Sequence, residues 1–281
     1  MDDIYLGLAI LFTSSIALFA TALWLSQRRS RLVCNCLATS SIIALVLYIR
    51  FVWYSTDLAK LLPYSNLIVI GNWFPLVAAF LAGLVWRMVP GSKARRSLWL
   101  LTLATASVLA AVFPFLGEPP RCGHSWDQRG FCVQTTDNTC SAACAATLLR
   151  LHGIEATEQE MAELCFTRRG TTWLGLYHGL KCKTEGTSWD VEIVSGETAE
   201  LVQREQAPTI LTVGLSNSVD AANRTDEGWI QGVDHSVIMM NFFEPGYFEI
   251  ADPAPGVGRE LWTTSDMRTL WRGHGMRLVR R

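Results

Sequence analysis

The sequence predicts an α-helical membrane domain with four transmembrane helices, followed by an α+β domain with a largely antiparallel sheet. Three observations lead to this prediction. The first part of the 281-residue chain holds four apolar stretches of membrane-spanning length. The remainder has the mixed charge of a globular domain, and its helical patterns precede a run of strand patterns. The composition changes at a stiff Gly-Glu-Pro-Pro segment, so we expect one domain over 1–117 and the other over 118–281.

The apolar stretches are each about twenty residues long, which is the length that a helix needs to cross the hydrocarbon core. Their approximate bounds are 4–25, 32–54, 67–86 and 98–116. Backbone groups cannot remain unpaired in lipid, so we expect each stretch to be helical. The first stretch does not resemble a cleavable signal, because Asp2 and Asp3 stand where a signal peptide is positively charged. Within the third stretch, Asn72 and Pro75 are interpreted as helix-packing residues.

Basic residues in the short loops predict the orientation of the chain in the membrane. Loops one and three together carry Arg28, Arg29, Arg31, Arg87, Lys93, Arg95 and Arg96. The second loop offers Lys60, with Arg50 near its start. Loops one and three should therefore be cytoplasmic, which places both ends of the chain outside a bacterial inner or plasma membrane. The net charge of −1 gives no argument for nucleic-acid binding.

The elements of the second half are expected from local patterns. Residues 140–151 form a helix that Gly153 ends, Thr157 and Glu160 form a capping box that opens a second helix, and a third covers 172–180. Apolar runs predict strands at 191–194, 209–213, 236–240, 247–251 and 276–279. A short helix near 265–271 precedes the last strand. Helices followed by turn-connected strands indicate an α+β domain.

Cys140 is the first candidate for chemistry. It stands at the expected start of a helix rich in Ala, Thr and Leu. A helix N-terminus concentrates unpaired N–H groups and partial positive charge, which stabilise a thiolate. Gln134, six residues earlier, can place its amide beside the thiolate as an oxyanion donor. The alternative interpretation is a buried helix cysteine with a chance upstream glutamine.

His235 and Asp252 complete the candidate catalytic set. His235 opens an apolar strand, where a general base can face a helix N-terminus. Asp252 ends the next expected strand, directly before a Pro/Gly-rich turn. Adjacent antiparallel strands would bring the carboxylate of Asp252 beside His235, where it would orient the imidazole and stabilise its charged form.

The segment Cys-Ser-Ala-Ala-Cys at Cys140–Cys144, followed by an apolar helix and Gly153, resembles the double-glycine leader peptidase family. That family includes the papain-like peptidase domains of bacteriocin-processing ABC transporters. The His-Ser-Val-Ile and Asp-Pro elements at His235 and Asp252 are similar to its later motifs. The resemblance implies a papain-like fold, a peptide or protein substrate and no cofactor or metal. It implies that Cys140 is the nucleophile, His235 the base, Asp252 the orienting residue and Gln134 the oxyanion residue.

The chain also departs from that family. Ser141 stands where the family has glycine, and Cys144 matches the family's second, non-nucleophilic cysteine. The sequence contains no GxxxxGK[ST] phosphate loop, so we expect no ATP-binding domain in this chain. The leading hypothesis is thiol peptide hydrolysis. Acyl transfer, as in transglutaminase-like enzymes, and a non-catalytic peptide receptor remain as alternatives.

The remaining cysteines of the second half are Cys122, Cys132, Cys165 and Cys182. An extracytoplasmic domain can keep disulfides, and the short separations favour the pairs Cys122–Cys132 and Cys165–Cys182. We therefore expect at least one disulfide. A metal site built from Cys122, His124 and Cys132 is the alternative, although this spacing fits no common zinc pattern.

Overall fold

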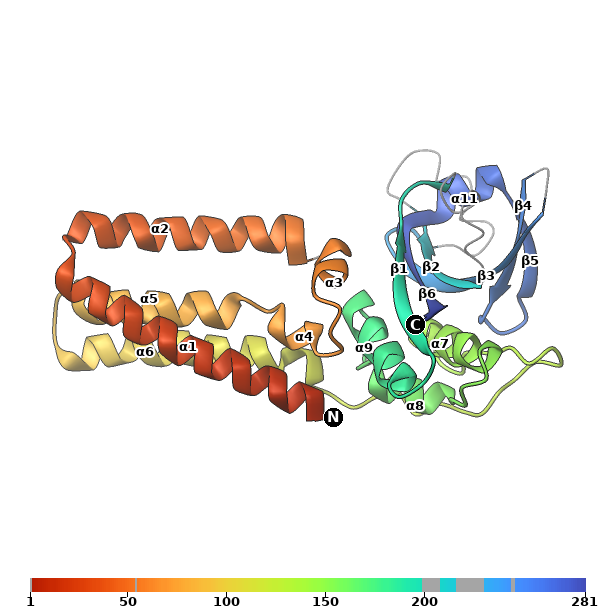
Figure 1. Ribbon diagram of the computed structural model, residues 1–281, viewed down its shortest axis with the longest axis horizontal. Coiled ribbons are helices and arrows are strands. Elements are labelled where there is room, and N and C mark those ends of the chain that lie inside the picture. Colours follow the sequence, from red (N-terminus) through yellow and green to blue (C-terminus); the bar gives the residue numbers. More distant parts are fainter. Residues whose placement is uncertain (1, 54, 199–207, 216–229, 244–245) are drawn as a thin grey trace. The chain divides into compact units, whose positions relative to one another are not determined.

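The computed structural model describes residues 2–53, 55–198, 208–215, 230–243 and 246–281. The chain divides into two compact units, Met1–Leu116 and Gly117–Arg281. The first unit is entirely helical, and the second combines helices with a single sheet (Figure 1). The predicted fold class, four long apolar helices followed by an α+β region, is confirmed.

The first unit contains four helices that are long and apolar enough to cross a membrane, within the part of the chain that the structure describes. These candidate spans are Asp3–Arg28, Arg31–Trp53, Leu67–Met88 and Lys93–Phe115. Their elements are α1 (Asp2–Arg28), α2 (Arg31–Tyr48) with the π-helical turn η1 (Ile49–Trp53), α4 (Leu67–Ile70), α5 (Phe74–Met88), and α6 (Lys93–Val112) with the 3₁₀ turn η2 (Phe113–Phe115). A short helix α3 (Asp57–Leu61) lies in the second loop. The ends of the apolar stretches were therefore predicted to within a few residues.

The third span differs from the prediction, because it is broken between α4 and α5 at residues 71–73. Pro75 is the second residue of α5, and a proline supplies no N–H to a preceding turn. The Oδ1 atom of Asn72 accepts a hydrogen bond of 3.3 Å from the N–H of Phe74, which restarts the helix. A continuous helix over 67–86 was expected because hydropathy does not register such a break.

The polar groups that the break frees are satisfied inside the bundle. The Tyr48 hydroxyl of α2 donates to the carbonyl oxygen of Gly71 at 2.6 Å. The side-chain amide of Asn72 donates to the carbonyl oxygen of Ala110 in α6 at 2.8 Å. Non-helical backbone is tolerated at membrane depth only where protein groups pair with it. Asn72 thus joins two helices, in keeping with its interpretation as a packing residue.

The second unit begins with three helices, α7 (Cys140–Leu151), α8 (Glu158–Leu164) and α9 (Trp173–Thr184), and α11 (Thr264–Leu270) follows later in the chain. The predicted helix over 140–151 has the same bounds in the structure. Gly153 follows it with φ of +75°, the left-handed conformation of a helix C-cap. The Thr157 side chain accepts from the N–H of Glu160, as expected for the start of α8.

Among the described residues, the sheet has six strands in the order β1-β6-β2-β3-β4-β5, and all neighbouring strands are antiparallel. The strands are β1 (Trp189–Ser195), β2 (Thr209–Gly214), β3 (Asp234–Phe243), β4 (Tyr247–Asp252), β5 (Gly258–Thr263) and β6 (Trp271–Arg280). Five of them cover the predicted strands. The edge strand β5 was missed, because its Gly-Arg-Glu-Leu-Trp-Thr sequence carries two charges and only two large apolar residues.

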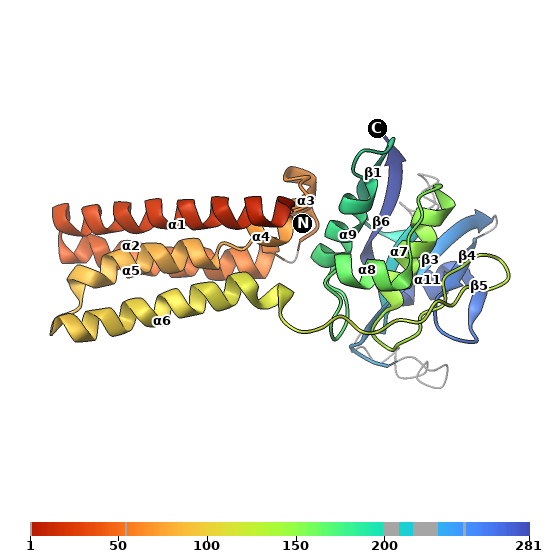
Figure 2. The same ribbon diagram turned by 90° about the horizontal axis from the view of Figure 1, so that it is seen from below.

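The two faces of the sheet have different partners, and Figures 1 and 2 show α7 and α11 on opposite sides. On one face, Val237 and Met239 of β3 join a buried cluster with Met267 and Leu270 of α11. The alternate residue Ser236 faces α7 on the other side. The sheet therefore holds β3 with one face in the core and the other against α7.

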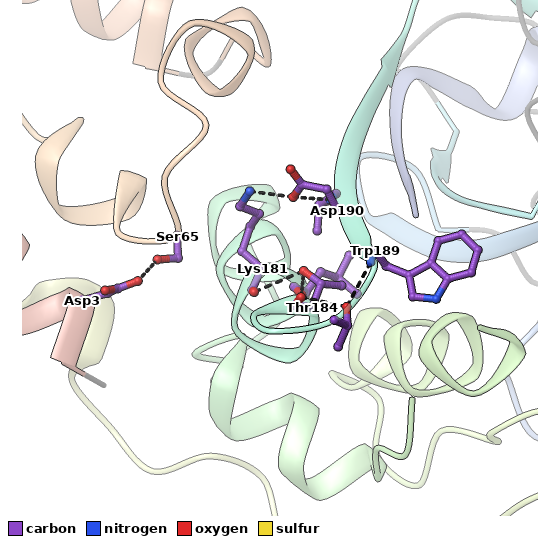
Figure 3. Close-up of polar contacts among 9 residues, drawn as sticks. Asp3, Ser65, Lys181, Thr184, Trp189 and Asp190 are labelled. Carbon is purple, nitrogen blue, oxygen red and sulfur yellow. Dashed lines mark hydrogen bonds and ion pairs between the residues drawn. The ribbon is translucent and has the colours of Figure 1, made fainter. Parts of the chain in front are cut away.

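Helix α9 packs closely against the end of α8 and forms an ion pair with β1. A Cβ atom added to Gly175 would lie 2.2 Å from the carbonyl oxygen of Cys165, at the end of α8. On the opposite side, Lys181 Nζ lies 2.7 Å from Asp190 Oδ1 of β1, as Figure 3 shows. Buried Thr184 ends the helix with its hydroxyl on the carbonyl oxygen of Leu180.

Candidate active site

Cys140 is the first residue of α7, and the N-terminus of this helix is not capped by a side chain. Thr139 occupies the N-cap position, but its hydroxyl donates to the carbonyl oxygen of Thr136 at 3.0 Å instead. In contrast, the N-cap residues of α8, α9 and α11 accept a backbone N–H from their own helices. The first N–H groups of α7 and their partial positive charge therefore remain available to a thiolate or an oxyanion.

His235 and Asp252 lie together at the ends of neighbouring strands. His235 Nε2 is 2.9 Å from Asp252 Oδ1, and Asp252 is nearly buried. The same carboxylate oxygen accepts the backbone N–H of Ala254 at 2.7 Å, which fixes the carboxylate in the turn after β4. The Cys140 side chain also acts on His235, because it raises the pKa of the imidazole together with Asp252.

Burial and hydrogen bonding act against each other on Cys140 and His235. Burial disfavours the thiolate, but the hydrogen bond and charge of His235, with hydrogen bonds from Ser236 and Ser141, outweigh it and lower the pKa of Cys140. Burial also disfavours the imidazolium, but Asp252 and Cys140 outweigh it and raise the pKa of His235 to about 10. Because each charged form stabilises the other, the two groups favour a thiolate–imidazolium pair.

Gln134 lies beside the turn that carries Asp252. Its backbone N–H donates to the carbonyl oxygen of Pro253 at 2.8 Å. Its side-chain Nε2 donates to the carbonyl oxygen of Thr136 at 3.2 Å, which leaves one amide hydrogen for another acceptor. The side chain is buried, and Oε1 finds no hydrogen-bond partner among the residues that the structure describes. The backbone of Gln134 is thus held against the turn that follows Asp252, and its side-chain amide is held by Thr136 of its own loop.

Several contacts in the site were not foreseen from the sequence. The Ser141 hydroxyl lies 2.8 Å from the hydroxyl of Ser236, the residue after His235. The Glu158 carboxylate of α8 accepts both the N–H and the hydroxyl of Thr135 at 2.8 Å, which anchors the residue after Gln134. The only sequence signal for the two serines is that each directly follows a candidate catalytic residue, and nothing in the sequence pairs Glu158 with Thr135.

The structure does not support the expected disulfides, because no two of the eight cysteines, all of which the structure describes, form a disulfide bond. The Cys165 thiol is buried at the end of α8, where a Cβ atom added to Gly179 of α9 would lie 2.4 Å from Cys165 Sγ. Cys182 Sγ lies 3.4 Å from His178 Nε2, one turn earlier in the same helix. These pairs were predicted because the cysteines are close in the sequence. The position of each thiol is set instead by the helix that carries it and by the residues around it.

The alternative of a metal site at Cys122, His124 and Cys132 finds no support in the structure. Among the described residues, no group of three or more His, Cys, Asp or Glu side chains could hold a metal ion. Burial is the main cause that raises the pKa of Cys122 to about 11 and that of Cys132 to about 12. Both side chains therefore remain neutral thiols near neutral pH.

No protein-family model and no curated protein sequence matches the chain. Structure comparison does find similar proteins. Part of the chain is similar to double-glycine peptidase domains. The peptidase domain of Streptococcus ComA, a bi-functional ABC transporter involved in a quorum sensing pathway, is 18% identical over 53% of this chain and 97% of that chain, with a TM-score of 0.43.

Two further solved structures belong to the same group. The peptidase domain of Streptococcus mutans ComA is 18% identical over 53% of this chain and 98% of that chain, with a TM-score of 0.37. A double glycine motif protease from an AMS/PCAT transporter, solved in complex with the leader peptide, is 15% identical over 58% of this chain and 94% of that chain, with a TM-score of 0.39. The sequence motifs at Cys140, His235 and Asp252 resemble this same family.

Proposed function

We propose that this chain is a membrane-anchored cysteine peptidase that cleaves a peptide or protein substrate with Cys140, His235 and Asp252. The observation that carries the proposal is the mutual stabilisation of the Cys140 thiolate and the His235 imidazolium, with Asp252 Oδ1 at 2.9 Å from the imidazole. A thiolate at an uncapped helix N-terminus beside a charged base is the arrangement that nucleophilic thiol catalysis requires.

The reaction proceeds in two steps. The thiolate of Cys140 attacks the scissile carbonyl carbon, while Gln134 and a backbone N–H at the start of α7 stabilise the oxyanion. His235 gives its proton to the leaving amine as the C–N bond breaks, which leaves a thioester on Cys140. His235 then takes a proton from water, and the resulting hydroxide attacks the thioester. The carboxylic acid product leaves and the thiolate–imidazolium pair is restored.

The peptidase unit is assigned to the extracytoplasmic side of the membrane. Basic residues gather where α1 joins α2 and where α5 joins α6, which makes these two loops cytoplasmic by the positive-inside rule. With four spans, the chain after α6 then lies outside. The absence of disulfides in the structure removes the second argument for this side, so the assignment rests on the loop charges.

The proposal is tested with a peptidyl electrophile that labels reactive thiolates on the purified full chain. We expect labelling that Cys140→Ala abolishes and that Cys144→Ala retains, since Ala suits both helical positions. Circular dichroism and thermal unfolding serve as folding controls. Labelling that depends on Cys144 instead of Cys140 would show that the nucleophile is misassigned.

Product analysis separates hydrolysis from the alternatives. Incubation of the enzyme and a cleavable peptide in H₂¹⁸O should place ¹⁸O in the new carboxyl group. A new amide in the presence of an added amine, with no ¹⁸O-labelled acid, would indicate acyl transfer. Binding of peptides without any turnover would indicate a receptor.

A further inference from the structure

Two hydrogen bonds join the start of β3 to the first turns of α7, and both involve Ser236. The hydroxyls of Ser236 and Ser141 lie 2.8 Å apart. The thiol of Cys144 donates to the carbonyl oxygen of Ser236 at 3.2 Å. One residue of the strand is therefore held by two residues of the helix, and its backbone also helps to lower the pKa of Cys140.

The positions of these residues connect them to the proposed chemistry. Ser141 directly follows the candidate nucleophile Cys140, and Ser236 directly follows the candidate base His235. A displacement of either serine therefore displaces the catalytic residue next to it. The contact joins residues that are 95 positions apart in the sequence, so it aligns two elements that only the tertiary fold brings together.

Burial makes these contacts hard to replace. Ser141 and Ser236 are each only 6% exposed, so water has little access to either hydroxyl if its partner is lost. Burial also raises the pKa of Cys144 well above that of an ordinary thiol, which keeps its S–H available as a donor. The Ser141 hydroxyl also helps to lower the pKa of Cys140. Each serine thus contributes both to the alignment of the two elements and to the environment of the nucleophile.

We propose that Ser141 and Ser236 form a hydroxyl pair that positions His235 against Cys140. Neither residue is a reacting group; both act through the catalytic residues that precede them. The inference rests on the proposed cysteine peptidase function. The titratable groups that surround Cys140 are His235 of β3, Asp252 at the end of β4 and Cys144 of α7, with Cys132 near Cys144.

The test measures how the ionisation of Cys140 depends on the pair. The full chain in detergent micelles is alkylated with iodoacetamide over a range of pH, and mass spectrometry quantifies modification at Cys140 separately from Cys144. We expect Ser141→Ala and Ser236→Ala each to raise the midpoint of alkylation by about one pH unit, and to lower kcat about tenfold with KM little changed. The double variant should be no worse than either single variant, because the two hydroxyls act as a unit.

Thr184→Val is the matched control, because it removes a buried hydroxyl in α9 that bonds only within its own helix end. This substitution should leave the pH midpoint of Cys140 alkylation unchanged. If both serine variants keep the low alkylation midpoint of the wild type, the proposed role of the hydroxyl pair is wrong. The proposed peptidase function would not be affected by that result. Shifts that add in the double variant would also overturn it, since the hydroxyls would then act separately. A wild-type Cys140 that ionises as an ordinary thiol would overturn both proposals.

Discussion

At the level of single residues, the candidate site depends on a histidine that interacts with two groups. Asp252 Oδ1 lies 2.9 Å from Nε2, and both Asp252 and the Cys140 side chain raise the pKa of the imidazole. Because Ala254 donates to the same oxygen of Asp252, the carboxylate cannot rotate away without losing two hydrogen bonds. The imidazole is therefore held in one orientation, and its charge is stabilised from both sides.

This arrangement predicts the pH dependence of activity. The Cys140 pKa lies below its ordinary value of 9.0 and the His235 pKa is about 10, so the charged pair exists between the two values. We expect kcat/KM to rise as pH increases through the lowered Cys140 pKa and to fall near pH 10, when His235 loses its proton. His235→Ala should lower kcat/KM by at least about 10³-fold and move the acidic limb to higher pH.

Asp252→Asn should fall between the wild type and His235→Ala. The amide oxygen can still accept from Nε2, but the variant loses a charge-assisted hydrogen bond of about 1.5–3 kcal/mol, which corresponds to about 10- to 100-fold in rate. A variant as inactive as His235→Ala would show that the charge itself, more than orientation, is required. A fully active variant would remove Asp252 from the catalytic set.

Gln134 gives a prediction that separates transition-state stabilisation from substrate binding. Gln134→Ala should lower kcat by about 10²- to 10³-fold, as expected for loss of one oxyanion donor, while KM changes little. Steady-state kinetics on a fluorogenic peptide checks this. The labelling of Cys140 by iodoacetamide should be unaffected, because this reaction develops no oxyanion. A large change in KM with unchanged kcat would assign Gln134 to substrate binding.

At the level of elements, the helices of the second unit depend on glycines where they approach one another. Gly175 of α9 faces the carbonyl oxygen of Cys165, and a Cβ atom there would lie at 2.2 Å. A backbone atom cannot move aside as the end of a flexible side chain can. The close approach explains why α9 carries two glycines in its interior, at Gly175 and Gly179, despite their unfavourable helix propensity.

Gly175→Ala therefore tests helix packing against helix propensity, because the two effects predict changes of opposite sign in the free energy of unfolding. Helix propensity alone predicts stabilisation by up to about 1 kcal/mol. Steric overlap with Cys165 predicts destabilisation by about 1–3 kcal/mol, and we expect the steric effect to dominate. Thermal unfolding of the full chain, followed through the second unit's tryptophans, measures the outcome. A raised Tm would show that α8 and α9 can separate without cost.

At the level of the whole molecule, the four long apolar helices of the first unit form a bundle with two distinct ends. Near the start of α1, the Asp3 carboxylate accepts from the Ser65 hydroxyl, as Figure 3 shows. The side-chain amide of Asn66 donates to the carbonyl oxygen of Asp3 at 3.0 Å. The start of the chain and the second loop therefore lie at the same end of the bundle. The basic loops one and three join the opposite helix ends.

The charge difference between the two ends of the bundle predicts the side of the membrane on which the second unit lies. We expect an alkaline phosphatase that needs disulfides to fold to be active when it is fused after Arg281. A green fluorescent protein fused at the same position and exported unfolded should be dark. Bright fluorescence with an inactive phosphatase would place the second unit in the cytoplasm.

The sequence by itself determined most elements and their order. The long apolar stretches, the helix that starts at Cys140 and five of the six strands follow from patterns within one segment, and such patterns reflect local burial. The proximity of His235 and Asp252 could also be predicted from the sequence, because neighbouring antiparallel strands limit where strand ends can meet. The roles assigned to these residues remain predictions.

Only the tertiary structure decided how the break in the third span is stabilised, whether the cysteines form disulfides, and which residues of α7 contact Ser236. The partners of the break, Tyr48 and Ala110, and the partners of Ser236 come from segments that are far apart in the sequence. The edge strand β5 was also decided by the tertiary structure, because pairing with β4 compensates for its weak local sequence pattern. Local patterns report which residues are buried, whereas the register between elements decides which buried atoms meet.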